Sequence, residues 1–399
     1  MFNCINPKNS LLRKIPYPYL GALSISNDIE LMRMDFFEEL MKFLNTNRKT
    51  LLGDGLNLEV TSSLFFFSVN PYNFSYFSSG YPKFTKSQYA SRLNEYLKSK
   101  LIDTNHSYGD FDGKGGFIRE YAVQCYNILN EIGVELKIFT NHGGEENNQN
   151  IGKDALYHLG DVKESKAYHA DLMKKHGVQY VWTDSCILSE KKERFNYFFI
   201  PLKNSKRKNI LEDIELQDGS KFKSFIRFRS TGLNAPNLSS LDYQLKRINW
   251  EKFYTENDVI IIYQHMGVLN KLGGECYPST IDDVKRRPEI YLRPFYFLAK
   301  ENKMGKLWIS SLYKLLNYID MINNVEINYN IKENIYRIEY MNDVEKPEIF
   351  FQGLTVYVNP QKPLKIYYKN KELFFSINGP DETGKYSVSI PLKTFGDIW

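Results

Sequence analysis

Two patterns of hydrophobic and polar positions alternate along the first 320 residues of the chain. The apolar run LGALSIS at residues 20–26 predicts a strand, and apolar residues recur at helical spacing over residues 30–46. The same alternation continues further along the chain. More strands are predicted at residues 60–69, 135–140, 178–183, 195–202, 223–229 and 258–264, and more helices at residues 86–101, 116–132, 164–176, 238–248, 280–301 and 307–321.

This alternation indicates an α/β fold with parallel βαβ units, because helices lie between most of the predicted strands. Several of the strands are continuously apolar, which is expected when both faces of a sheet are covered. Six or seven such units favour a distorted (β/α)7-type barrel over a doubly wound sheet, although periodicity alone is compatible with either. No glycine-rich phosphate loop follows a predicted strand, which weakens a nucleotide-binding interpretation.

From about residue 323 the pattern changes to short alternating segments such as VEINYNI, IYRIEYM and LKIYYK, separated by Asn, Gly, Pro, Asp and Lys. This pattern predicts a small antiparallel β unit. The chain is therefore divided into a barrel domain, residues 1–320, and a β-rich C-terminal domain, residues 321–399. The second domain either caps the first or serves as a carbohydrate-binding accessory.

The composition limits the classes of protein to which this chain can belong. Hydrophobic residues make up 42% and charged residues 25% of the 399 residues, which is typical of a globular protein. The net charge of +5 is too small to indicate a nucleic-acid partner. The N-terminal sequence lacks the apolar core of a signal peptide, and no run is long enough to span a membrane. The four cysteines do not form a disulfide framework, so a cytoplasmic location is expected.

Chemically active side chains follow several predicted strands. Asn27 and Asp28 end the first strand, and His142, Asp184 and His265 end later ones. In parallel α/β folds, functional residues gather at the carboxyl ends of the strands, so these side chains are expected at one rim.

Two further residues, His106 and Asp110, lie four positions apart in a predicted loop. An imidazole and a carboxylate in this arrangement can bind one cation from the same side, and Asp28 would complete the ligand set. Such a set leaves positions open for water and substrate. Of the six histidines, His169 lies on a predicted helix and is expected at the surface.

The order of these segments resembles the polysaccharide deacetylase superfamily, which includes the nodulation-type deacetylases of carbohydrate esterase family 4. That family has a strand ending in Asp-Asp, a His-[Ser/Thr]-x-x-His motif and a late hydrophobic strand ending in His. Here the corresponding segments are ALSIS followed by Asn27-Asp28, the segment HSYGD at residues 106–110, and IIIYQH ending in His265. The resemblance covers roughly residues 17–320.

The resemblance implies a (β/α)7 barrel with one divalent metal ion, either Zn, Mn, Fe or Mg, bound by Asp28, His106 and Asp110. It also implies that His265 is the general acid. Asn27 occupies the position of the family's general base, and an amide cannot accept a proton there at neutral pH. Another carboxylate would then have to act as the base, the candidates being Asp161, Glu145 and Asp184.

Five residues are candidates for substrate contacts. Asn141 and His142 lie beside glycines that allow a ligand to approach the backbone, although a plain turn explains them equally well. Trp182 is either a platform for a sugar ring or part of the core. Arg227 and Arg229 alternate along one strand and face the same side, where they would hold a charged substrate or form a solvated strand face.

The predicted function is that of a metal-dependent carbohydrate deacylase, an amide or ester hydrolase acting in bacterial surface polysaccharide biosynthesis or modification. The absence of an export signal favours a nucleotide-linked or lipid-linked sugar as the substrate. Asn27 keeps two alternatives open. One is a glycan hydrolase or transferase on the same scaffold, and the other is a non-catalytic carbohydrate-binding protein.

Overall fold

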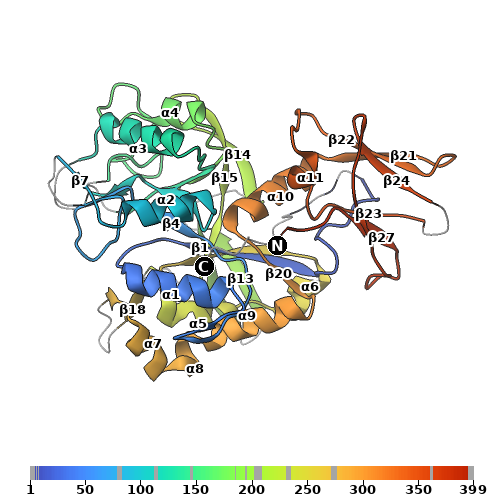
Figure 1. Cartoon of the computed structure of the whole chain (residues 1–399), viewed down its shortest axis with the longest axis horizontal. Helices are drawn as coiled ribbons and strands as arrows, with labels where there is room; N and C mark the ends of the chain where they lie inside the picture. The colour runs from blue at the N-terminus through green and yellow to red at the C-terminus, as the bar shows by residue number, and fades with distance from the viewer. Residues whose placement is uncertain are drawn as a thin grey trace.

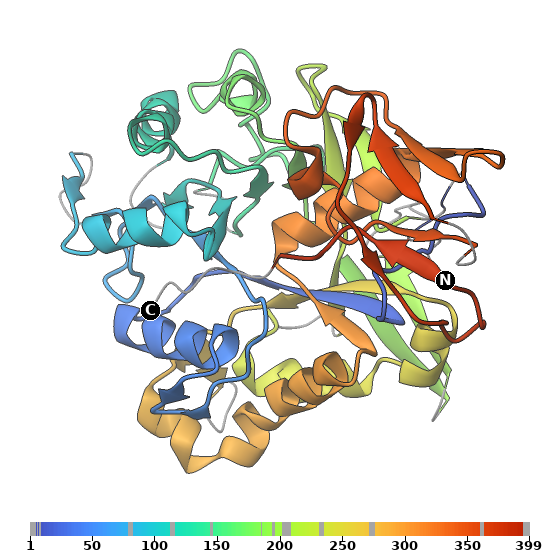
Figure 2. The same cartoon turned by 45° about the vertical axis from the view of Figure 1, so that its right-hand side comes forward.

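The computed structural model describes residues 5, 7, 9–78, 83–111, 116–143, 147–184, 186–193, 196–201, 209–230, 235–270, 276–359 and 363–393. Its architecture is mixed α/β, with one large and mostly parallel sheet and several small, mainly antiparallel sheets (Figure 1). Helices α2, α3 and α4 lie along one side of the large sheet, and α1, α5, α7, α8 and α9 lie along another (Figures 1 and 2).

The large sheet has 12 strands in the order β13-β12-β16-β17-β1-β4-β8-β10-β11-β15-β14, and β20 also pairs with β1. The pairs β12·β13 and β14·β15 are antiparallel, and the other pairs are parallel. The strands are β1 (Gly21–Asn27), β4 (Ser62–Leu64), β8 (Ile102–His106), β10 (Ile138–Thr140), β11 (Tyr180–Trp182), β12 (Cys186–Glu193), β13 (Asn196–Pro201), β14 (Leu211–Glu215), β15 (Lys221–Phe225), β16 (Arg227–Ser230), β17 (Val259–Gln264) and β20 (Leu307–Ile309).

Along the chain, most of the helices come between these strands. They are α1 (Met34–Asn45), α2 (Ala90–Lys98), α3 (Arg119–Glu131), α4 (Ala170–Lys175), the 3-10 helix η1 (Leu238–Ser240), α5 (Leu241–Lys246), α6 (Trp250–Thr255), α7 (Ile281–Arg286), α8 (Pro288–Tyr291), α9 (Arg293–Lys303), α10 (Leu312–Asn324) and α11 (Pro347–Phe350). Short two- or three-residue pairs lie in the loops: β2 (Lys49–Thr50) with β3 (Gly53–Asp54), β18 (Val268–Asn270) with β19 (Cys276–Pro278), and β5 (Phe67–Ser68) with β6 (Phe77–Ser78), β7 (Thr85–Lys86) and β9 (Gly109–Asp110).

Strand β17 shows why the central strands are continuously apolar. Its residues alternate between two hydrophobic clusters: Ile260 and Ile262 belong to the cluster under α1, α2 and α3, and Val259, Ile261 and Tyr263 belong to the cluster that contains α10. Both faces of the strand are thus buried, so no polar residue is needed to face water.

The predicted helices and strands differ from the structure at several places, and the predicted strand at residues 223–229, for example, is divided into β15 and β16. The predicted helix at residues 307–321 begins with strand β20, and only its second part is helical, as α10. The predicted helix at residues 280–301 is divided into α7, α8 and α9, because Pro288 and Pro294 each stand in the first turn of a new helix. Strand β8 was not predicted, since its sequence IDTNH is polar at four of five positions.

The C-terminal unit contains two small sheets. One joins β21 (Glu326–Asn330), β22 (Ile335–Glu339), β24 (Lys365–Tyr368) and β25 (Lys371–Glu372), and the other joins β23 (Thr355–Tyr357), β26 (Ser376–Ile377) and β27 (Ser387–Ser389). Strands β22 and β24 are parallel, and the remaining pairs are antiparallel. The unit shares one hydrophobic cluster with α10 and with one face of the large sheet. Leu12 also pairs with Val356, so the start of the chain packs on this unit.

His169 is fully buried rather than at the surface as expected. Its Nε2 lies 2.7 Å from the carbonyl oxygen of Gln149, and its Nδ1 lies 3.0 Å from the hydroxyl of Tyr108. Burial lowers the pKa of His169 from 6.5 to about 4. The folded protein therefore binds fewer protons here than the unfolded chain at intermediate pH.

This difference predicts a pH-dependent stability. The contribution of His169 should be complete above pH 6.5 and should be lost as the pH falls towards about 4. The total loss is about 3 kcal/mol, because each pKa unit corresponds to about 1.4 kcal/mol. Urea unfolding of the wild type and His169→Gln at several pH values would test this. The stability difference between the two proteins should shrink on acidification, and a constant difference would contradict the prediction.

Candidate metal centre

The end of β1 supplies two carboxylates and one amide to the site. The side-chain amide of Asn27 donates to Ser62 Oγ at 2.8 Å, and its oxygen accepts from the backbone N–H of Met266 at 2.7 Å. Asn27 thus joins the end of β1 to the first residue of β4 and to the loop after β17, and both its polar atoms are used in doing so. Asp28 and Glu30 follow in the next loop.

This loop turns back towards the sheet before α1 begins. Leu31 has a left-handed backbone with φ 53°, and the side chain of Asn73 accepts a hydrogen bond from its N–H at 2.7 Å. Helix α1 then starts at Met34. Glu30 therefore lies in the loop rather than in the helix, and its carboxylate faces the ends of the strands.

Three histidines extend from neighbouring parallel strands. His106 is the last residue of β8, His142 follows two residues after β10, and His265 follows directly after β17. All three side chains are buried. The parallel register of β1, β4, β8, β10 and β17 brings their carboxyl ends to one edge, as the sequence predicted.

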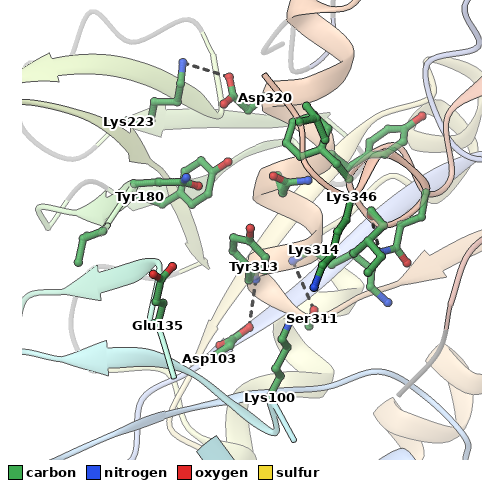
Figure 3. A pocket seen from close by; sticks show the side chains of 18 of the residues that line it. Lys100, Asp103, Glu135, Tyr180, Lys223, Ser311, Tyr313, Lys314, Asp320 and Lys346 are labelled. Atoms are coloured by element: carbon green, nitrogen blue, oxygen red, sulfur yellow. Dashed lines mark hydrogen bonds and ion pairs between the residues drawn. The ribbon is translucent and has the colours of Figure 1, made fainter. Parts of the chain in front are cut away.

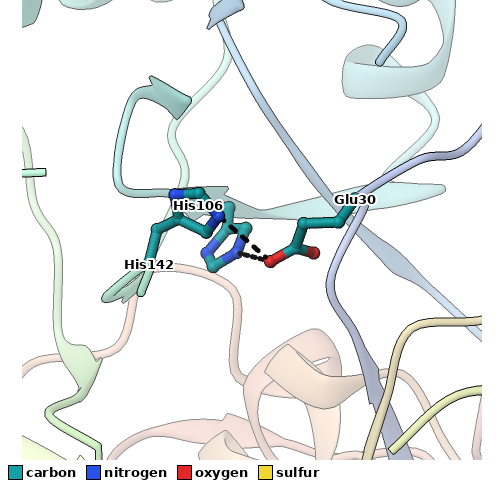
Figure 4. Close-up of side chains that lie close together, drawn as sticks. All are labelled: Glu30, His106 and His142. Atoms are coloured by element: carbon teal, nitrogen blue, oxygen red, sulfur yellow. Dashed lines mark hydrogen bonds and ion pairs between the residues drawn. The ribbon is translucent and has the colours of Figure 1, made fainter. Parts of the chain in front are cut away.

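The three imidazoles converge on one oxygen atom. Glu30 Oε1 lies 3.1 Å from Nε2 of His106 and 3.4 Å from Nε2 of both His142 and His265. Figure 4 shows the Glu30 carboxylate directed at the rings of His106 and His142. Two overlapping groups have ligand atoms within 4.8 Å of one another: Glu30, His106 and His142, and Asp28, Glu30 and His265. These buried groups could hold a metal ion.

The rings are fixed by groups on their far side. His106 Nδ1 lies 2.8 Å from Thr140 Oγ1, and His265 Nδ1 lies 2.6 Å from the carbonyl oxygen of Pro236. Phe65 stacks on the His106 ring at 5.0 Å. Hydrogen bonding of the outer nitrogen to an oxygen is the usual arrangement of a metal-binding histidine, because it sets the tautomer and aims the other nitrogen at the ion.

The lone pairs of these side chains are arranged to suit a bound cation. A carbonyl oxygen only accepts, so the proton of neutral His265 lies on Nδ1 and its Nε2 carries a lone pair. That lone pair faces the oxygen of Glu30, which is also an acceptor. Two facing acceptors repel unless a proton or a metal ion lies between them. Glu30 Oε2 and His142 Nδ1 also have no hydrogen-bond partner among the described residues.

The pKa values of Glu30, His106 and His265 are shifted by the charges that these groups exert on one another. Burial by itself raises the pKa of Glu30, but positive charge on His265 and His106 outweighs it and holds the pKa well below 4.5. Burial by itself lowers the pKa of both histidines. The charges of Asp28 and Glu30 reverse this effect, so the pKa values of His106 and His265 are raised. In the metal-free state, protons thus take the place that a cation would fill.

Arg227 anchors Asp28 from inside the fold. Its Nη1 lies 2.9 Å from each carboxylate oxygen of Asp28 and 3.2 Å from Ser26 Oγ. The guanidinium lies 3.4 Å from the ring centre of Trp182 and 3.7 Å from that of Tyr263. Arg227 is completely buried, so it does not form the solvated strand face considered from the sequence. Trp182 likewise packs on the arginine and is 4% exposed.

The other predicted site residues lie around the cluster in different roles. Asp110 is in neither potential ligand group among the described residues, and its carboxylate accepts from the Asn73 amide at 3.0 Å. Asp161 accepts from the backbone N–H groups of Gly152 and Gln217 and from the Gln217 amide. It thus ties two loops together. Glu145 lies outside the described residues.

Asn141, Asp184 and Arg229 lie at the same rim. The Asn141 amide donates to Asp184 Oδ2 and to the carbonyl of Ile151, both at 2.9 Å. Asp184 Oδ2 also lies 3.6 Å from His158 Nε2. Arg229 is half-buried on β16, on the same side of the strand as Arg227.

Glu30 is the central residue that the sequence analysis missed. The helical spacing of apolar residues placed it at the start of a helix. The available signal was the pair of carboxylates Asp28 and Glu30, two positions apart at the exit of a buried strand.

No family model, no curated protein and no solved structure matches this chain. Among the described helices, none combines the length and the apolar character needed to cross a membrane.

Proposed function

We propose that this protein is a metal-dependent hydrolase that removes an acyl group from a carbohydrate. The observation that carries the proposal is the convergence of three imidazole Nε2 atoms on Glu30 Oε1, beside a second buried carboxylate, at the carboxyl ends of parallel strands. Such a set suits one divalent cation. A cation bound there would polarise the acyl oxygen and increase the acidity of a water molecule.

We assign the metal ligands to Glu30, His106 and His142, with Asp28 and His265 at the edge of the same cluster. This set contains more nitrogen than the one predicted from the sequence, in which Asp110 took the place of a histidine. Imidazole ligands suit Zn and Fe better than Mg, which prefers oxygen. Zinc or iron is therefore the proposed ion.

Asp28 is the proposed general base in place of Asn27. Asn27 uses its amide for hydrogen bonds that join strands, whereas Asp28 offers a carboxylate whose position is fixed by Arg227. A carboxylate held in this way can accept a proton from water without reorienting. With Asn27 in the motif, the sequence showed no general base, and this had favoured the two alternative functions. Asp28 would supply that base.

His265 is the proposed general acid. The carbonyl of Pro236 fixes its Nδ1, so Nε2 faces the cluster. From this position Nε2 would pass a proton to the leaving nitrogen or oxygen of the sugar.

The barrel is also part of the proposal. Strands β11 and β12 are separated by residues 183–185, and β15 and β16 by Ile226 alone. In the strand order, β11 and β15 lie near one end of the sheet and β12 and β16 near the other, so these short connections link the two ends through the chain. We infer that the sheet closes as a distorted (β/α)7-type barrel.

The sugar substrate rests on the resemblance to polysaccharide deacetylases. One observation supports this choice of substrate. Three segments carry the resemblance, and they lie at the ends of β1, β8 and β17, where they meet at one cluster. A nucleotide-linked or lipid-linked sugar precursor remains the proposed form of the substrate.

Acetate release tests this proposal. The purified protein, loaded with zinc or iron, would be incubated with N-acetylated nucleotide-sugars and with N- and O-acetylated oligosaccharides. We expect release that stops when a chelator is added. Asp28→Asn and His265→Gln should each lower kcat by about 100-fold to 10,000-fold, which is the usual contribution of a general base or acid.

Asp54→Asn serves as the control, because it removes an exposed carboxylate of β3 and should retain wild-type activity. A metal-loaded protein that releases acetate from none of these sugars would refute the deacylase proposal. Retention of activity in Asp28→Asn would refute the assignment of the base.

A further inference from the structure

A large cavity lies away from the metal centre. It encloses about 1400 Å³ between the large sheet, α10 and the C-terminal unit. Its lining includes residues at the starts of β8, β10, β11 and β15, such as Asp103 and Tyr180. The metal-centre residues follow the opposite, carboxyl ends of β1, β8, β10 and β17, so the cavity and the centre lie at opposite edges of the sheet.

Figure 3 shows how separate parts of the chain surround this cavity. Tyr180 and Glu135 lie on one side, Tyr313 of α10 lies in the middle, and Lys346 of the C-terminal unit lies on the other side. The space exceeds the 300–1,000 Å³ of a typical small-molecule site, so it suits an extended ligand.

The lining carries eight lysines and seven acidic residues, a net charge of +1, and lysines outside it pair with two of the acidic residues, Glu135 and Asp343. Glu59 pairs with Lys314 at 2.6 Å, and Asp213 and Asp320 both pair with Lys223, at 3.2 and 3.1 Å. These pairs neutralise much of the acidic lining.

Six other lysines of the lining have no ion-pair partner among the described residues. They come from separate segments and are Lys98 and Lys100 at the end of α2, Lys174 on α4, Lys221 on β15, Lys346 before α11, and Lys393. Their ammonium groups are available to a ligand with negative charge.

The rest of the lining suits a ligand rich in hydroxyl groups. Tyr313 and Tyr340 are half-buried and offer aromatic faces from two sides of the cavity. Tyrosine combines an apolar face with a hydrogen-bonding hydroxyl. Glu135 and Glu345 supply carboxylates that can accept hydrogen bonds from hydroxyl groups.

We propose that this cavity binds an acidic oligosaccharide, in which negative charges are spaced along a chain of sugar hydroxyls. Lysines without partners would bind its charges, tyrosines would pack against its rings, and the carboxylates would accept from its hydroxyls. A nucleic acid also carries regularly spaced negative charge, so it is the competing ligand that the test separates from an acidic oligosaccharide. This binding function goes beyond the proposed hydrolysis and does not depend on it.

The test measures binding of defined oligosaccharides by isothermal titration calorimetry. The acidic panel consists of hyaluronan, alginate and polygalacturonate oligosaccharides, and the comparison ligands are a neutral chitin oligosaccharide and single-stranded oligothymidylate. We expect at least one acidic oligosaccharide to bind more tightly than both comparison ligands. The double variant Lys100→Gln and Lys346→Gln should weaken that binding by about tenfold or more, since both charges are lost.

Two controls show whether the binding belongs to this cavity. Lys285→Gln removes an exposed lysine of α7 outside the cavity and should bind like the wild type. Glu30→Gln alters the metal centre at the other edge of the sheet and should also retain binding. Tyr313→Ala removes one aromatic face and provides a second test that does not depend on charge.

Three results would overturn the proposal. One is failure of every acidic oligosaccharide to bind. Another is equal or tighter binding of the chitin oligosaccharide or of oligothymidylate. The third is unchanged affinity in both the lysine double variant and Tyr313→Ala when circular dichroism shows that these variants are folded.

Discussion

Glu30→Gln is expected to weaken binding of zinc or iron by at least about 100-fold, because even the loss of an outer hydrogen-bond partner of a metal ligand costs about 10-fold to 100-fold. Glu30 Oε1 is the atom on which the Nε2 atoms of His106, His142 and His265 converge. The substitution keeps the size of the side chain and removes its charge. Metal titration of the apo-protein, followed by elemental analysis after dialysis, would measure the effect.

Asp110→Asn is the matched control for this experiment. Asp110 was a predicted ligand, but its carboxylate accepts a hydrogen bond from Asn73 and it belongs to neither potential ligand group. We expect this variant to bind metal nearly as tightly as the wild type. If Asp110→Asn loses the metal while Glu30→Gln retains it, the ligand set predicted from the sequence is right and the assignment of Glu30 as a ligand is wrong.

Arg227→Met is expected to lower the free energy of unfolding by about 3–5 kcal/mol, since removal of one partner leaves a buried charge without compensation. Asp28 would keep a carboxylate that is 1% exposed and has lost the guanidinium 2.9 Å from both its oxygens. Arg227→Lys should recover little of this loss. A lysine cannot present a flat group between the rings of Trp182 and Tyr263.

The double variant Asp28→Asn with Arg227→Met tests whether charge is the cause. Removing both charges should restore part of the stability lost in Arg227→Met, because no uncompensated carboxylate remains. Arg229→Met, on the same strand but only half-buried, should cost about 1 kcal/mol or less. Urea unfolding of the wild type and of the four variants measures these differences. A double variant no more stable than Arg227→Met would show that packing, rather than charge, explains the loss.

The positions of several site residues could be predicted from the sequence. A run of apolar residues such as VIII predicts a buried strand, and the first polar residues after it lie at the sheet edge. This rule correctly placed Asp28, His142 and His265 just beyond the ends of their strands. Such information is local, because it needs only the pattern of one strand and the loop that follows it.

The sequence was less informative where tertiary contacts override the local pattern. Strand β8 is polar at four of five positions, yet it is buried between β4 and β10, so the position of His106 at a strand end was not predicted. The segment before α10 matches a helical period, but pairing with β1 makes it strand β20. In both cases the neighbouring strands supply the hydrogen bonds and the burial.

The sequence by itself determined the alternation of strands and helices, the strand exits and the residue types available for a metal site. Only the tertiary structure decided which of those residues meet. It turned the loop after β1 so that Glu30 faces three histidines from β8, β10 and β17. It also enclosed Arg227 between rings from β11 and the end of β17. These contacts join residues far apart in the chain, and their partners are fixed by the order of strands in the sheet, which hydrophobic periodicity does not encode.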